Sequence, residues 1–117
     1  MVGKSMSNKV LRKIKFWAWT LDLDHFTIRV EPILELQVTG DDGSPGRELV
    51  GVEVDRERFV ASIVTTRKLR EDDIVHELVH VRNPDWHEEM VAHETESLLV
   101  SRDSNYFEAR TTGKERV

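Results

Sequence analysis

Two histidines and a glutamate in the second half of the chain have types and a spacing suited to metal-dependent hydrolysis. His76 and His80 are four residues apart, so on a helix they lie on one face, one turn from each other. Both imidazoles could then bind one zinc ion at about 2.0–2.1 Å. Glu77 could take a proton from a zinc-bound water, whose pKa the metal lowers to about 7. The sequence therefore predicts zinc ligands at His76 and His80 and a catalytic base at Glu77.

The alternative interpretation is a pair of core histidines whose spacing arose by chance. The residues around them are apolar, with Ile74 and Val75 before the motif and Leu78 and Val79 inside it. Polar side chains in such surroundings need partners. This context favours the zinc interpretation.

A catalytic zinc usually has three protein ligands and one open position, so a third ligand must come from another segment. Glu89 is the favoured candidate, because it lies in the first turn of the next predicted helix. Glu88 is the immediate alternative, with a side chain pointing about 100° away, and His87 or His93 could also ligate. His93 could instead hydrogen-bond a zinc ligand or a reaction oxyanion, or it could be an ordinary, partly exposed helix residue.

Hydrophobic periodicity predicts the elements that would position these groups. Asn83-Pro84 separates the two helices of the site, because Asn favours an N-cap and Pro the first helical position. The predicted elements are a helix over about 7–21, strands over 26–30 and 34–38, a loop over 40–46, a hairpin with strands at 50–54 and 59–63, a helix from about 69, and a last helix that reaches about 100–102. We expect one α+β domain over residues 1–117: an N-terminal helix, a small antiparallel or mixed β-sheet, the His-Glu-x-x-His helix and a glutamate helix.

Composition narrows the class of protein further. There is no cysteine, so a metal must be held by His, Asp or Glu, and the formal net charge of −5 argues against a nucleic-acid partner. No apolar run is long enough for a membrane span or a signal peptide. We therefore expect a cytoplasmic protein with no membrane partner. Trp19 lies off the buried stripe of the first helix and could mark a contact surface, as in a homodimer.

With these residues in hand, the chain resembles the gluzincins, zinc peptidases with His-Glu-x-x-His on one helix and a glutamate ligand on the next. Its short length makes it similar to the minigluzincins, which are soluble single-domain peptidases. The resemblance implies zinc on His76, His80 and Glu89, with Glu77 as general base and acid. It also implies kinship with the catalytic cores of membrane-embedded peptidases.

Two further features bear on this resemblance. Glu89-Met90-Val91-Ala92 matches a Glu-x-x-Ala pattern of regulator-cleaving peptidases from bacteria and phages. His93 departs from the gluzincin pattern, which commonly has an acidic or amide residue four positions after the glutamate ligand. The residue that usually hydrogen-bonds a ligating histidine in that family is thus replaced here by a histidine.

The predicted function is a zinc-dependent endopeptidase acting on a peptide or protein substrate. An edge strand at 59–64 would hold the substrate as an added strand. The polar tail over about 103–117 could make the protein latent, because its carboxylates at Asp103, Glu108, Glu115 and the terminus could block the open zinc position, as the zymogen-like minigluzincins imply. The alternative function is a non-catalytic binding module stabilised by zinc, with His87 or His93 as a fourth ligand.

Overall fold

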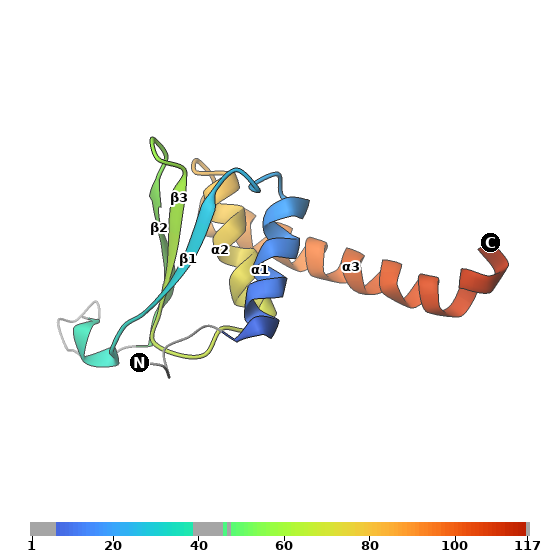
Figure 1. Ribbon diagram of the computed structural model, residues 1–117, viewed down its shortest axis with the longest axis horizontal. Coiled ribbons are helices and arrows are strands. Elements are labelled where there is room, and N and C mark those ends of the chain that lie inside the picture. The colour runs from blue at the N-terminus through green and yellow to red at the C-terminus, as the bar shows by residue number, and fades with distance from the viewer. Residues whose placement is uncertain (1–6, 39–45, 47, 117) are drawn as a thin grey trace.

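The computed structural model describes the backbone of residues 7–38, 46 and 48–116, and their side chains as far as residue 102. It shows an α+β fold of helices and a small mixed sheet, which confirms the predicted class (Figure 1). The elements in chain order are α1 (Asn8–Thr20), β1 (Thr27–Pro32), the 3₁₀ helix η2 (Glu35–Gln37), β2 (Val50–Asp55), β3 (Val60–Thr65), α2 (Glu71–Arg82) and α3 (Glu88–Arg116).

The sheet has the strand order β1-β3-β2, with β3 parallel to β1 and antiparallel to β2. β2 and β3 form the predicted hairpin. Its turn is closed by Asp55, whose carboxylate accepts a hydrogen bond from the backbone N–H of Arg58 at 3.2 Å. Phe59 ends the turn with φ at 57°, a left-handed conformation that is uncommon for an aromatic residue.

The strand predicted at 34–38 is wrong. Leu34 and Leu36 are 68% and 76% exposed, and the chain forms η2 instead. The backbone N–H of Leu34 donates to Gln37 Oε1 at 2.8 Å, which satisfies it locally. Alternation over five residues is a weak signal, because a strand also needs a partner at the sheet edge. The loop predicted at 40–46 lies outside the described residues except for Gly46.

The core lies between one face of the sheet and helices α1 and α2 (Figure 1). The apolar stripe predicted for α1 at Val10, Ile14, Trp17 and Leu21 is confirmed, since Val10 is half-buried and the other three are buried. Ser7 begins the helix as an N-cap, accepting the N–H of Val10 at 3.2 Å. Trp19 points away from this core and is 71% exposed.

The last helix differs from its prediction at both ends. It begins at Glu88 rather than at Pro84, because residues 83–87 form a turn in which Trp86 N–H donates to Asn83 O at 3.1 Å. It continues to Arg116 rather than ending near 102, and its far half leads away from the sheet (Figure 1). Missing apolar periodicity removes a buried face but does not stop a helix, and no Pro or Gly occurs between 103 and 112. None of the described helices, this long one included, is both long and apolar enough to cross a membrane.

Candidate metal centre

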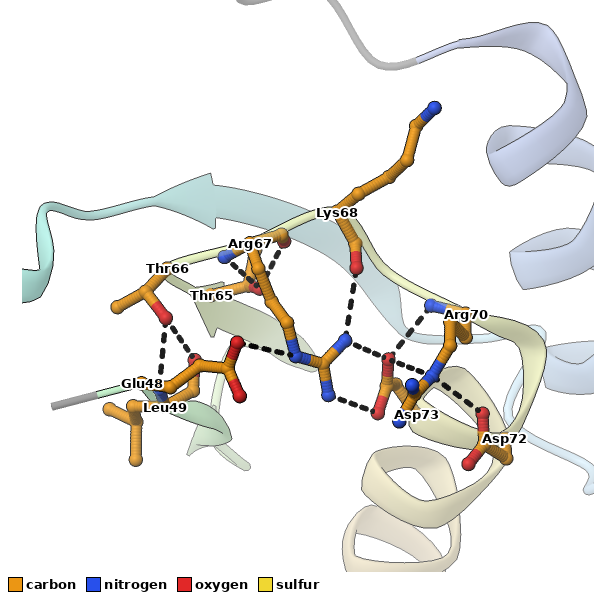
Figure 2. Close-up of polar contacts among 9 residues, drawn as sticks. All are labelled: Glu48, Leu49, Thr65, Thr66, Arg67, Lys68, Arg70, Asp72 and Asp73. Atoms are coloured by element: carbon orange, nitrogen blue, oxygen red, sulfur yellow. Dashed lines mark hydrogen bonds and ion pairs between the residues drawn. The ribbon is translucent and has the colours of Figure 1, made fainter.

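The first turn of α2 is fixed to the segment that leaves the sheet by an ion pair between Arg67 and Asp73. Two guanidinium nitrogens of Arg67 donate to the two carboxylate oxygens of Asp73 at 2.7 and 2.9 Å (Figure 2). Asp73 also accepts the backbone N–H of Arg70 at 2.8 Å, which caps the helix. Burial opposes ionisation of Asp73, but these hydrogen bonds and nearby positive charges hold its pKa below the ordinary value. This pair positions the helix that carries the histidines.

We expect Asp73→Asn to lower the free energy of unfolding by about 1.5–3 kcal/mol at pH 7, because it weakens charge-assisted bonds to a largely buried group. A carboxyl whose folded pKa is lowered contributes stability above its unfolded pKa and loses it as the pH falls through the folded one. The difference in free energy of unfolding between the native and variant chains should therefore shrink below about pH 4. Urea unfolding at pH 7 and pH 3 measures both.

Asp72→Asn is the matched control for this prediction. Asp72 is the neighbouring residue of the same first turn, but its side chain is 54% exposed and its ion pair to Arg70 is 3.5 Å long. Exposed pairs of this kind contribute about 0–1 kcal/mol. An equal loss of stability in both variants would show that the helix dipole, rather than the Arg67 pair, sets the effect of Asp73.

One carboxylate links the three helices. Glu71 Oε2 accepts the indole N–H of Trp17 at 2.7 Å and a guanidinium N–H of Arg102 at 2.6 Å. Lys13 lies 3.9 Å from the other oxygen. Because these donors come from α1 and α3, the contact fixes α3 beside the helix that carries the histidines.

The structure brings His76, His80 and Glu88 together. The Nε2 atom of His76 is 3.0 Å from one carboxylate oxygen of Glu88, and the Nε2 atom of His80 is 2.9 Å from the other. Burial opposes ionisation of Glu88, but its hydrogen bonds to the histidines and their charge hold its pKa below the ordinary value. Both imidazoles and the carboxylate thus converge on one point.

The other predicted candidates for the third ligand lie elsewhere. Glu89, which the sequence favoured, is exposed and belongs to no group of metal-ligating side chains among the described residues. His87 and His93 are also exposed and outside the cluster. The structure therefore places the alternative, Glu88, in the position expected for Glu89. The reason is the helix start at residue 88, which turns the first residue of α3 toward α2.

The cluster suits a metal ion by its donor chemistry. One ligand atom from each of His76, His80 and Glu88 lies within 4.8 Å of the others. Two imidazoles and a carboxylate are a donor set of catalytic zinc sites. The same set binds iron(II) in other proteins, so the choice of metal depends on the groups nearby.

Glu77 is the nearest such group along the chain, and it is unusual for a carboxylate. Only 6% of it is exposed, and it makes no hydrogen bond or ion pair within the part of the chain that the structure describes. Burial, together with the negative charges of Glu88 and Asp73, raises its pKa to about 7. A pKa near 7 suits a group that exchanges protons at neutral pH.

A cleft of about 510 Å³ opens beside the cluster. His76 and Glu77 line it from α2, while Ala92, Thr95 and Leu99 line it from one face of α3. Leu49 and Val50, where β2 begins, form a further wall. Glu77, the predicted base, and His76, a predicted zinc ligand, therefore face a space large enough for part of a peptide.

The strand predicted to hold a substrate is not at an edge. β3 pairs with β1 on one side and β2 on the other, so residues 60–65 have no free edge, and this prediction is wrong. Pairing between distant segments decides which strand is central, and alternation within one strand carries no information about it. Among the described residues β2 pairs with β3 alone, and β2 is the edge that begins at the cleft.

No family model, curated protein or solved structure was found to match the chain. The resemblance to gluzincins therefore stays a prediction made from the residues of the motif.

Proposed function

We propose that this protein is a zinc-dependent endopeptidase of the gluzincin type, with His76, His80 and Glu88 as zinc ligands. The observation that carries the proposal is Glu77, a residue only 6% exposed whose carboxylate has no partner among the described residues and which lines a cleft beside a His-His-Glu cluster. An open site with three protein ligands is typical of catalytic zinc, whereas structural zinc usually has four. This favours a peptidase over a zinc-stabilised binding module.

When bound, zinc would supply a Lewis acid that polarises a carbonyl and lowers the pKa of water. The residues of the chain would do the remaining work. Glu77 would accept the proton of the attacking water and deliver it to the leaving amine. Its burial keeps the carboxylate basic enough to accept a proton near neutral pH. Glu88 and the two histidines would hold the ion beside that base.

The substrate would bind as an added strand along β2. This strand has a free edge among the described residues, and it starts at Val50, which lines the cleft. Backbone hydrogen bonds to an edge strand hold an extended peptide with little dependence on its sequence. A peptide in this position would run past His76 and Glu77.

Zinc should be required for cleavage. We expect the chain stripped with a chelator to leave unfolded casein intact and the chain reloaded with one equivalent of zinc to cleave it. The Lewis acid is essential to this chemistry, so activity should follow zinc occupancy. Reloading with iron(II) or magnesium is the control. Full zinc occupancy without cleavage, together with unfolding on chelation, would favour the binding module.

Latency through the C-terminal residues can be tested by truncation. The backbone of α3 leads away from α2 beyond residue 102 (Figure 1). We therefore expect a chain ending at Arg102 to cleave casein at the rate of the full chain. A large gain in rate after truncation would instead support the zymogen-like behaviour predicted for residues 103–117. Circular dichroism and zinc stoichiometry of both chains control for folding.

A further inference from the structure

The walls of the cleft carry more carboxylates than cations. Its acidic side chains are Glu48, Asp72, Asp73, Glu77 and Glu96, and its only basic side chain among the described residues, apart from His76, is Arg67. Arg67 and Asp73 neutralise each other through their paired hydrogen bonds (Figure 2). The balance of the remaining groups therefore decides the charge of the cleft.

These remaining acids are weakly compensated. Glu48 lies 3.6 Å from Arg67 Nε and is 64% exposed, and Asp72 lies 3.5 Å from an Arg70 that is itself 68% exposed. Such exposed pairs are weak. Glu96 has no ion pair within the described part of the chain. The cleft of the metal-free chain is thus negative overall, and His76 of the His-His-Glu cluster lines it.

Glu77 is an independent sign that the cleft accepts a ligand. Glu77 as a residue is more than nine-tenths buried and has no hydrogen-bond or ion-pair partner among the described residues. No buried side-chain oxygen among those residues lacks a partner, so the carboxylate oxygens of Glu77 still reach solvent. Its place in the lining of the cleft means that water or a bound molecule meets it there.

The apolar part of the lining suits a long side chain. Leu49, Val50 and Leu99 provide surface for an aliphatic stem. Lys and Arg side chains bury such stems and keep the charged end near water or a carboxylate. Asp72 lies on α2 and Glu96 on α3, so acids stand on both helices that bound the cleft.

We propose that this part of the cleft is a specificity subsite for a lysine or arginine side chain of the peptide, next to the bond that is cleaved. Leu49, Val50 and Leu99 contact the stem, and Glu96 and Asp72 attract the cationic end. The proposal rests on the proposed peptidase function. It makes basic peptides the preferred substrate class.

The test compares peptides that differ at one position. Synthetic Ala/Ser decapeptides carry lysine, norleucine or glutamate at the centre and are offered to the zinc-loaded full chain. We expect kcat/KM for the lysine peptide to exceed that for the norleucine peptide by about 1.5- to 5-fold, the range for a partly exposed charge pair. The glutamate peptide should be slowest, and added salt should reduce the difference.

Variants of the acidic residues show which side chains cause the preference for lysine. Glu96→Gln and Asp72→Asn should each lower the lysine-to-norleucine ratio, and the double variant should bring it close to one. Glu94→Gln is the matched control, because it makes the same charge change on the same helix outside the lining of the cleft. It should leave the ratio unchanged. Circular dichroism of each variant shows whether it has folded.

Binding separates this proposal from the proposed peptidase function. The same peptides are titrated into the zinc-loaded chain, and amide NMR signals of residues 92–99 are followed. Tighter binding of the lysine peptide without any cleavage would support the subsite and overturn the peptidase. Cleavage with no lysine preference, or with a preference that survives the double variant, would overturn the subsite alone. Equal binding of all peptides without cleavage would overturn both.

Discussion

Replacing Glu77 with glutamine is expected to leave zinc bound and to lower the rate of peptide cleavage at least about 100-fold, the smaller end of the range for loss of a general base. Glutamine keeps the shape of the side chain but cannot accept the proton. Zinc stoichiometry and casein cleavage, measured on the same preparation, test both parts. Cleavage at the native rate in a folded, zinc-loaded variant would overturn the assignment of Glu77 as the base.

The same substitution, which lowers activity, should raise the free energy of unfolding of the metal-free chain. In the metal-free chain the pKa of Glu77 is raised from 4.5 to about 7. A raised carboxyl pKa means that the folded state binds the proton more tightly than the unfolded state, so stability is lost as the pH rises from about 4.5 to 7. Metal-free Glu77→Gln should therefore be more stable than the native chain at pH 8, by up to about 3 kcal/mol. Unfolding of the two metal-free chains at pH 8 and pH 4 measures this.

Removing the carboxylate of Glu88 should strongly weaken zinc binding. Glu88→Gln takes away the only carboxylate in the cluster, so we expect zinc affinity to fall about 100-fold or more, beyond the loss typical of a group that merely supports a ligand. Cleavage at limiting zinc should fall with it. Competition with a chromophoric zinc chelator measures the affinity directly.

Glu89→Gln is the control for that measurement. Glu89 is the next residue along α3, also exposed and subject to the same helix dipole, but it lies outside the cluster. Its substitution should change zinc affinity less than about twofold, as for most surface changes. A large loss in Glu89→Gln with none in Glu88→Gln would restore the ligand that the sequence favoured.

Much of the fold could be predicted from local patterns. Helical spacing of apolar residues identified the helix around His76, and the hairpin followed from alternating strands on either side of a short turn. These patterns are reliable because each element buries its own apolar face. The same reasoning placed both histidines and Glu77 on one helix without any knowledge of the rest of the chain.

Other features could not be predicted from apolar patterns alone, and one of them depends on a distant part of the chain. The choice between Glu88 and Glu89 turned on where α3 begins, because one residue rotates a side chain by about 100°. The central position of β3 depends on its pairing with β1, some thirty residues earlier. The extension of α3 beyond residue 102 could not be predicted from apolar spacing, because that stretch lacks an apolar stripe.

The anchoring of α2 at both ends has a consequence for how the site takes up a metal. Glu71 and Asp73 fix its first turn through their contacts with Trp17 and Arg67. At its last turn, Arg56 donates a hydrogen bond to the carbonyl oxygen of Val81, and Arg82 of the helix itself donates to the carbonyl oxygen of Leu21. The histidines lie between these anchors, already hydrogen-bonded to Glu88. The site is thus preorganised, so binding an ion costs little conformational entropy. Amide hydrogen exchange within α2 should then be nearly as slow in the metal-free chain as in the zinc-loaded one.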